Sequence, residues 1–322
     1  MAQAILIGIG AGAAAALLFA SVVSGSAIAL LLACLAPLPI LIAALGWSHW
    51  AALIAALVGG LSLGAVLGPA LFPAFVIRVG LPAWWLGYLA LLARPAAATT
   101  PAQLEWYPVG NLVVWAALLA AAVVGALLLS FGLDEASIQA GLRTPVERFL
   151  RALIRTPTGS PLELGARTRQ LVDFLVAVVP PGIAVSLTII NLINLWLAAR
   201  IVKISGRLRR PMPELATMRF PVHAPLLLAI AMAASFLPGM VGIGGGVLAA
   251  ALLMAFAILG FAVLHAITRG MSSRLLVLGA IYAAVIIFGW PVMALSLIGL
   301  ADTAFDIRGR VAKRRGPPTT PT

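Results

Sequence analysis

Long apolar runs recur along the chain, and the short segments between them hold most of its charged residues. A helix needs about 20 consecutive apolar residues to cross the hydrocarbon core of a bilayer. Only 9% of the 322 residues are charged, whereas a soluble domain carries roughly 25%. So few charges cannot cover a soluble surface of this size, and apolar side chains must therefore face lipid. The sequence predicts an all-α, polytopic transmembrane helix bundle.

The apolar runs predict about eight to ten membrane segments. The expected spans lie at 4–22, 26–46, 50–67, 69–93, 109–131, 171–199, 222–239 and 245–266, followed by an apolar block at 275–301. Gly289-Trp290-Pro291 interrupts this block, which either crosses once or forms a hairpin. We favour the hairpin, because it returns the basic tail to the side of the basic loop at 200–220.

Four regions follow from this pattern: N-terminal membrane helices at 1–131, an amphipathic surface segment at 132–170, C-terminal membrane helices at 171–306 and a basic disordered tail at 307–322. In the second region Val146, Phe149, Leu150 and Ile154 recur near helical spacing, with arginines opposite. This spacing predicts an amphipathic helix on the membrane surface. An ordinary solvated connector is the alternative.

The net charge is +12, and its distribution indicates topology. The basic residues lie between apolar runs and form no basic face with interleaved aromatics, so no nucleic acid is expected as a partner. They are expected to contact anionic lipid headgroups and to stay in the cytoplasm. The sequence therefore predicts a multi-pass protein of a bacterial inner (cytoplasmic) membrane. Counting spans back from the basic loop puts residues 132–170 outside, whereas their excess of basic residues favours the cytoplasm, so the side of this segment stays open.

Small residues spaced by four form stripes on two of the expected helices. The first stripe comprises Gly8, Gly12, Ala16 and Ala20, and the second comprises Gly60, Gly64 and Gly68. Such spacing lets helix backbones approach closely in lipid. The partner is either another helix of this chain or another membrane subunit.

Two groups of helix-breaking residues predict turns or hinges. They are Pro180 and Pro181 in the sixth span, and Gly242, Gly244, Gly245 and Gly246 before the eighth. The glycine group is no Walker loop, because Val247 and Leu248 stand where a Lys and a Ser or Thr are needed. No nucleotide or other cofactor is expected.

Few polar residues lie within apolar runs. Asn191 and Asn194 share a helix face and either bond to a neighbouring helix or line a ligand cavity, and Arg78 either reaches the interface or pairs with an anionic group. Asp302 and Asp306, followed by Arg308, predict a capped and paired helix end. The histidines have no metal-ligand spacing, so no metal site is expected.

Several short elements carry a resemblance to a known family: Pro37-Leu38-Pro39, Gly80-Leu81-Pro82-Ala83, the NLINLWLAAR run from Asn191 to Arg200, Phe220-Pro221, Leu264-His265, and the C-terminal element containing Gly299, Asp302, Asp306 and Arg308. In these the chain resembles the YybS-like family of uncharacterised bacterial membrane proteins. That family distantly resembles the substrate-binding subunits of energy-coupling-factor transporters. The resemblance implies a solute pocket, and a small-residue stripe on the first helix that docks an ATPase module.

Three function classes remain open. A solute-binding or transport component is supported by the resemblance, the stripes and the intramembrane asparagines. The alternative is a non-enzymatic assembly or scaffold protein. An intramembrane enzyme would need convergent acid, base and nucleophile, for which Asp302, Asp306 and His265 are the only candidates. No enzymatic activity is expected.

Overall fold

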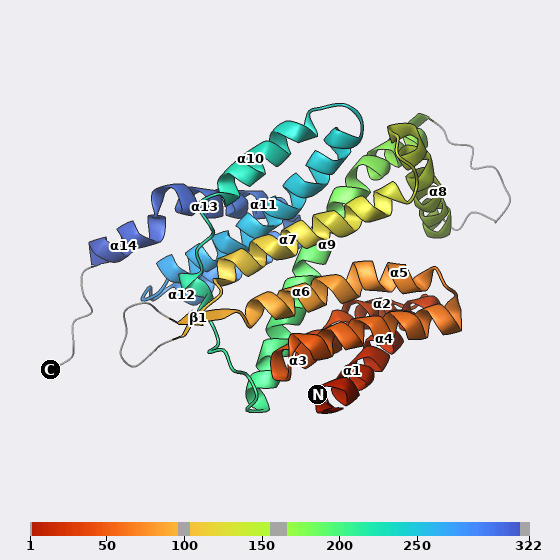
Figure 1. Cartoon of the computed structure of the whole chain (residues 1–322). Coiled ribbons are helices and arrows are strands. Elements are labelled where there is room, and N and C mark those ends of the chain that lie inside the picture. The colour runs from red at the N-terminus through yellow and green to blue at the C-terminus, as the bar shows by residue number, and fades with distance from the viewer. Residues whose placement is uncertain (1, 96–103, 155–165, 316–322) are drawn as a thin grey trace.

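The computed structural model describes residues 2–95, 104–154 and 166–315, and most of them form helices (Figure 1). Seven helical stretches in this part of the chain are long and apolar enough to cross a membrane: Ala2–Ser24, Ala27–Gly46, His49–Leu67, Leu71–Ala90, Val109–Leu129, Arg167–Ile204 and Gly239–Ile267. Three shorter apolar helices accompany them. The predicted all-α transmembrane bundle is thus confirmed.

Some of these stretches consist of more than one helix. The N-terminal half contains α1 (Ala2–Ala20), α2 (Ala27–Cys34), α3 (Pro37–Gly46), α4 (His49–Leu67), α5 (Leu71–Phe75), a π-helical turn (Val76–Gly80), α6 (Leu81–Ala90) and α7 (Val109–Leu129). The C-terminal half contains α8 (Glu135–Ile154), α9 (Ala166–Ile204), α10 (Ala224–Ser235), α11 (Gly239–Ile267), α12 (Arg274–Phe288), α13 (Pro291–Phe305) and α14 (Ile307–Arg315). Strands β1 (Ala93–Pro95) and β2 (Leu104–Trp106) pair antiparallel between α6 and α7.

Two apolar cores hold the bundle together. One is formed mainly by α1, α3, α4 and α6, and the other mainly by α7, α10 and α11. Helices α7 and α9 contribute side chains to both cores and lie between the two groups of helices (Figure 1). In lipid, association of helices depends on close side-chain packing, so these two shared helices join the halves.

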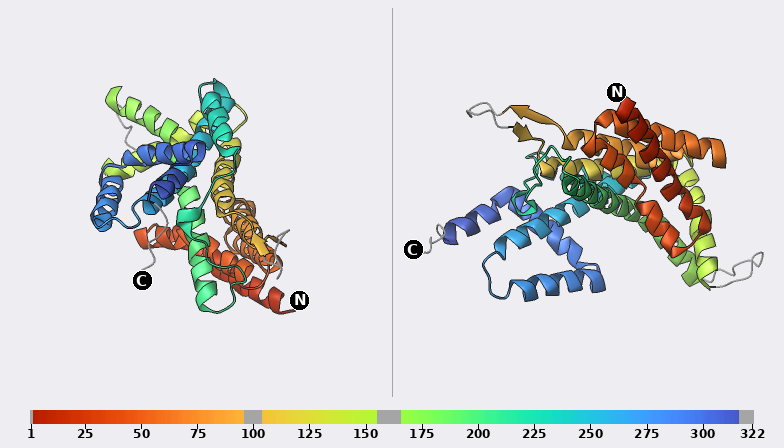
Figure 2. Two further views of the ribbon diagram at one scale, coloured as in Figure 1. Left: turned by 90° about the vertical axis from the view of Figure 1, so that its left-hand side faces the viewer. Right: turned by 90° about the horizontal axis from the view of Figure 1, so that it is seen from below.

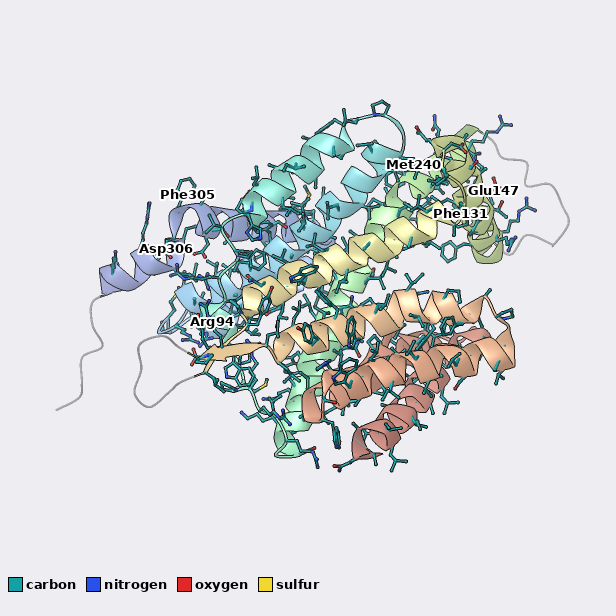
Figure 3. The ribbon with its side chains drawn as sticks, viewed as in Figure 1. Arg94, Phe131, Glu147, Met240, Phe305 and Asp306 are labelled. Atoms are coloured by element: carbon teal, nitrogen blue, oxygen red, sulfur yellow. The ribbon has the colours of Figure 1, made fainter. Side chains whose placement is uncertain are left out.

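The charged segments gather at two ends of the bundle. The structure bounds the basic loop at residues 205–223, between α9 and α10. One end of the bundle carries this loop, the β1–β2 hairpin with Arg94, and Asp306, and the opposite end carries α8 with Glu147 (Figure 3). Two contacts tie the first end together: Arg210 Nη1 lies 3.2 Å from the Ala90 carbonyl oxygen, and Arg219 Nη2 lies 3.1 Å from Asp306 Oδ1. Loops far apart in sequence therefore meet beside the basic loop.

Helices α12 and α13 form the favoured hairpin (Figure 2). Residues on both sides of it contact the basic loop, since Arg269 lies 3.4 Å from Glu214 and Asp306 pairs with Arg219. The chain thus enters and leaves the hairpin at the same end of the bundle. Each helix has 15 residues and is about 22 Å long, which is shorter than the roughly 30 Å hydrocarbon core.

Helix α8 is amphipathic, and its apolar face lies on α9. Ile138, Leu142, Val146 and Leu150 are buried at helical spacing, and the last two contact buried Val172 of α9. Phe149 was placed on this face by the sequence pattern, but it is 65% exposed. The pattern misassigned it because Phe149 lies next to Leu150 and so points about 100° away around the helix.

Three local predictions are wrong. Pro180 and Pro181 make no turn and lie inside the continuous 39-residue α9. The glycines at 242 and 244–246 make no turn, because α11 begins at Gly239 and includes them. In lipid the backbone must satisfy its own hydrogen bonds, which keeps such segments helical. The predicted disordered tail at 307–322 begins with helix α14, and residues 316–322 lie outside the described part.

Candidate functional site

The second membrane span is broken in its middle. Pro37 and Pro39 lack the N–H groups that would continue the helix, so α2 ends at Cys34 and α3 begins at Pro37. A tight turn joins them, in which Leu38 N bonds to the Leu35 carbonyl. The Cys34 carbonyl instead accepts a hydrogen bond from Asn194 Nδ2 of α9 at 2.9 Å. Asn194 therefore closes the break from a neighbouring helix.

The fourth span contains an irregular turn next to this break. Residues Val76–Gly80 form a π-helical turn that joins α5 to α6 and carries Arg78. Pro82 lacks the N–H that would bond to the Arg78 carbonyl in a regular helix. Gly80 allows close packing on α4, because a Cβ there would lie 2.9 Å from that of Ala56. Such π-turns are frequent at functional sites.

A cavity of about 170 Å³ lies between these two irregular segments and α9. Its polar lining residues are Arg78, Asn191 and Cys34, and its apolar wall includes Phe19 and Leu187. Asn191 is only 4% exposed. Within the described part of the chain, Arg78 makes no hydrogen bond and no ion pair. We call this space the Arg78 cavity.

The Arg78 cavity lies within the membrane-spanning part of the bundle. Arg78 follows the start of α5 at Leu71 by seven residues, a rise of roughly 10 Å. Cys34 is the last residue of α2, and this helix has eight residues, or about 12 Å. Both residues therefore lie inside candidate membrane spans, Leu71–Ala90 and Ala27–Gly46.

The sequence predicted Asn194, Arg78 and Asn191 as candidate cavity residues, but in the structure only Arg78 and Asn191 line the cavity. Asn194 is 1% exposed and does not line the Arg78 cavity. Its Nδ2 donates to the Cys34 and Ile190 carbonyls at 2.9 and 2.8 Å, while its Oδ1 has no partner among the described residues. Asn194 therefore joins two helices, and Asn191 faces the cavity. Cys34 also lines it, which its single occurrence in an apolar run did not indicate.

The two small-residue stripes contact helices of the same chain. Gly8 and Gly12 of α1 face α4, where a Cβ at Gly12 would lie 2.6 Å from the Ala55 carbonyl oxygen. Ala16 is buried and Ala20 is half-buried. Gly60 and Gly64 of α4 face Phe72 of α5. Gly68 follows α4 with a φ of +122° and makes the turn into α5.

The C-terminal element is a buried ion pair at the end of α13. Arg308 Nε and Nη2 donate to Asp302 Oδ2 at 3.0 and 2.7 Å, and Arg308 Nη1 donates to the Ala216 carbonyl at 2.8 Å. Asp306 ends α13 in a left-handed conformation, with a φ of +46°. The pairing of this helix end agrees with the prediction, and it attaches α14 to the basic loop.

A second cavity, which the sequence did not predict, lies at the end of the bundle that carries α8. It measures about 490 Å³. Its lining includes four of the residues that the sequence had predicted as turns: Pro180, Pro181, Gly242 and Gly246. Its polar residues include Glu135 and the ion pair between Arg143 and Asp173. The one feature of the sequence that could have indicated this cavity is Asp173, an acidic residue at the start of an apolar run. No cluster of three His, Cys, Asp or Glu suited to a metal exists among the described residues.

Comparison with known protein families matches residues 13–303 to the family described as "Predicted membrane protein (DUF2232)". Searches of curated proteins and of solved structures found no match. The match extends from within α1 to within α13 and includes both the Arg78 cavity and the α12–α13 hairpin. The chain therefore belongs to the DUF2232 family of predicted multi-pass membrane proteins.

Proposed function

We propose that this protein binds a small anionic solute in the Arg78 cavity, as the solute-binding or transport component of a membrane system. One observation carries the proposal: Arg78, without a partner in the described residues, shares a cavity with buried Asn191. A charged residue at membrane depth costs about 2.5–3.5 kcal/mol on insertion scales. An anionic group bound beside Arg78 would offset this cost with charge-assisted hydrogen bonds.

The broken helix supports the same function. Solute sites of many transporters lie near the bilayer midplane, between discontinuous helices whose ends offer backbone groups. Here α2 ends at Cys34 and α3 begins at Pro37, and both residues line the cavity. The cavity of about 170 Å³ limits the solute to a small molecule or the small head of a larger one.

The resemblance to energy-coupling-factor subunits also supports solute binding, and it raises the question of a partner. In those subunits the stripe on the first helix docks the ATPase module. In this chain α4 packs against Gly8 and Gly12 and covers this part of the stripe. An ATPase module would therefore have to dock on another surface of this protein, such as the basic loop.

A non-enzymatic assembly or scaffold protein is the second candidate, and the outer face of α8 favours it. Phe149 is 65% exposed and lies beside exposed Arg148. An aromatic and a basic residue side by side suit contact with a membrane surface or a protein. This role would not need the Arg78 cavity to hold a solute.

We further infer that the protein is not an enzyme. The three candidate acid or base groups are engaged in separate pairs: Asp302 with Arg308, Asp306 with Arg219, and His265 with Tyr282 at 2.9 Å. Catalysis would need such groups to converge on one reacting atom.

Purification in a gentle detergent, followed by mass spectrometry of small molecules and proteins, tests the proposal. The wild-type protein should carry one defined anionic solute in near-equal amount. Arg78→Gln should lose it, while Arg94→Gln, a change of the same charge on the exposed β1–β2 hairpin, should retain it. Equal recovery from both variants, or recovery of lipids alone from the wild type, would refute the solute-binding role. Envelope proteins in place of a solute would favour the scaffold.

A further inference from the structure

A mainly apolar cavity lies between the two halves of the bundle, under the basic loop. It measures about 600 Å³, within the range of small-molecule and cofactor sites. Its walls come from α7, α9 and α11, and residues 208–218 of the basic loop cover one end. Because it is separate from the Arg78 cavity, its function can be tested independently. We call it the interlobe groove.

One charged residue lines the interlobe groove among the described residues, and it is Arg210. Its Nη1 donates to the Ala90 carbonyl at 3.2 Å, and no described carboxylate pairs with it. Burial lowers the pKa of the Arg210 guanidinium, a sign that its charge is poorly solvated there. A guanidinium has five N–H donors, so several remain for an anionic oxygen.

The groove opens toward the outer surface of α9. Ile193 and Trp196 line it and are 50% and 46% exposed, so they also form part of the surface that faces lipid. The Arg200 guanidinium lies over the Trp196 ring, 5.4 Å from its centroid. A second cation therefore stands beside the opening, at the end of the bundle that carries the basic loop. Trp and Arg at such a position mark the depth of lipid headgroups.

The wall chemistry favours a hydrocarbon chain over a water-soluble ligand. Nucleotides and sugars carry many hydroxyl and amide groups, and these would be left without hydrogen-bond partners against an apolar wall. Three methionines line the groove, Met212, Met218 and Met254. Their flexible side chains adapt to irregular apolar shapes, as a bent acyl chain requires.

We propose that the interlobe groove binds one anionic phospholipid of the surrounding bilayer, with its phosphate at Arg210 and an acyl chain between α9 and α11. The lipid enters sideways past Ile193 and Trp196. Its phosphate occupies the remaining donors of Arg210, and Arg200 adds a second positive charge at the opening. The bound chain fills the space between the two halves of the bundle.

Native mass spectrometry of the protein in equimolar phosphatidylglycerol and phosphatidylcholine tests this proposal. The wild type should retain one phosphatidylglycerol in preference to phosphatidylcholine. Arg210→Gln should reduce its occupancy about tenfold or more, the effect of one charge-assisted hydrogen bond. The matched control is Arg209→Gln, since Arg209 is exposed and lies outside the groove, and it should retain the lipid.

A second variant covers the case in which Arg210→Gln fails to fold. Ala199 lines the groove, so Ala199→Phe fills it and should exclude the lipid while leaving Arg210 intact. Glycerol phosphate, which has the anionic group without the chain, should not compete. Equal losses from Arg209→Gln and Arg210→Gln, equal retention of both lipids, or competition by glycerol phosphate would each overturn the proposal.

Discussion

The carboxylate of Asp302 accepts two hydrogen bonds from the guanidinium of Arg308, at 3.0 and 2.7 Å, with side chains only 4% and 10% exposed. The same carboxylate accepts from the Arg308 backbone N–H at 3.0 Å. One residue thus holds both the side chain and the backbone at the start of α14. The nearby pair of Asp306 and Arg219 has side chains that are 52% and 69% exposed.

This difference in burial predicts different effects of the same substitution. Asp302→Asn leaves the Arg308 charge buried without a counter-charge, and we expect a loss of about 3–5 kcal/mol in the free energy of unfolding. Asp306→Asn removes an exposed pair and should cost only about 0–1 kcal/mol. Thermal unfolding of the purified protein in detergent measures both. Equal effects would contradict the structural role of the Asp302–Arg308 pair.

The architecture could be predicted from the sequence because the bilayer imposes it. The length and polarity of the apolar runs determine how many helices can cross, and the positive charges on each side of 275–301 favoured a hairpin. The turns predicted from the prolines at 180–181 and the glycines at 242–246 are absent, because these residues affect a helix differently in water and in lipid. In α11 the lack of a Cβ serves packing, since one at Gly245 would lie 2.6 Å from Ser235 N.

The candidate site could be predicted only in part. Arg78 and Asn191 stand out in sequence as polar residues in apolar runs, but nothing in the sequence shows which of them meet. Asn194 has the same signal as Asn191 and a different role. Arg210 looked like one of many basic loop residues, and only the folded loop places it in the interlobe groove.

Close packing of α11 on α13 predicts a second pair of outcomes. A Cβ at Gly260 would overlap the Leu295 carbonyl oxygen, whereas a Cβ at Gly244 of the same helix meets nothing within 4 Å. Gly260→Ala should therefore destabilise the protein by about 1–3 kcal/mol. Gly244→Ala should be neutral or stabilise it by up to about 1 kcal/mol, the helix propensity gained. Detergent thermostability measures both, and tolerance of Gly260→Ala would argue against this helix contact.

Replacing the two asparagines of α9 by alanine should lower the stability of the protein to different extents. Asn194→Ala removes the donor to the Cys34 carbonyl, and an unsatisfied buried carbonyl costs about 1–3 kcal/mol. Asn191→Ala changes the wall of the Arg78 cavity and should alter thermostability by less than about 1 kcal/mol. The reverse order, measured by thermal unfolding, would mean that Asn191 is the structural residue and that the cavity assignment is wrong.

Helix α8 should lose stability in acid. Asp134 precedes it and accepts hydrogen bonds from the Ser137 hydroxyl and backbone N–H at 2.6 and 2.9 Å, which lower the pKa of Asp134. A lowered carboxyl pKa gives stability that is full above the unfolded value of about 3.9 and is lost as pH falls through the folded value. The protection factors for amide hydrogen exchange across α8 should therefore fall only in strong acid. Asp134→Asn keeps an N-cap and should abolish that dependence.

The α12–α13 hairpin predicts that its tip reaches neither surface of the membrane. Trp290 follows α12 and is 68% exposed in the bundle, so its ring is free to contact lipid. Cys34 is the only cysteine, and a Cys34→Ser background allows single cysteines to be labelled with an impermeant maleimide. Lys313→Cys should react from the side of the basic loop, and Gln139→Cys on α8 should react from the opposite side.

Trp290→Cys is the informative position. The two helices of the hairpin are each about 22 Å long, and both ends of it contact the basic loop through Arg269 and Asp306. The tip therefore stops within the hydrocarbon core, and Trp290→Cys should stay unlabelled in vesicles of either orientation. Labelling from the Gln139 side would mean that α12 and α13 each cross the whole membrane, by thinning the bilayer around them. Labelling from the Lys313 side would mean that the hairpin lies on the surface instead of entering the membrane.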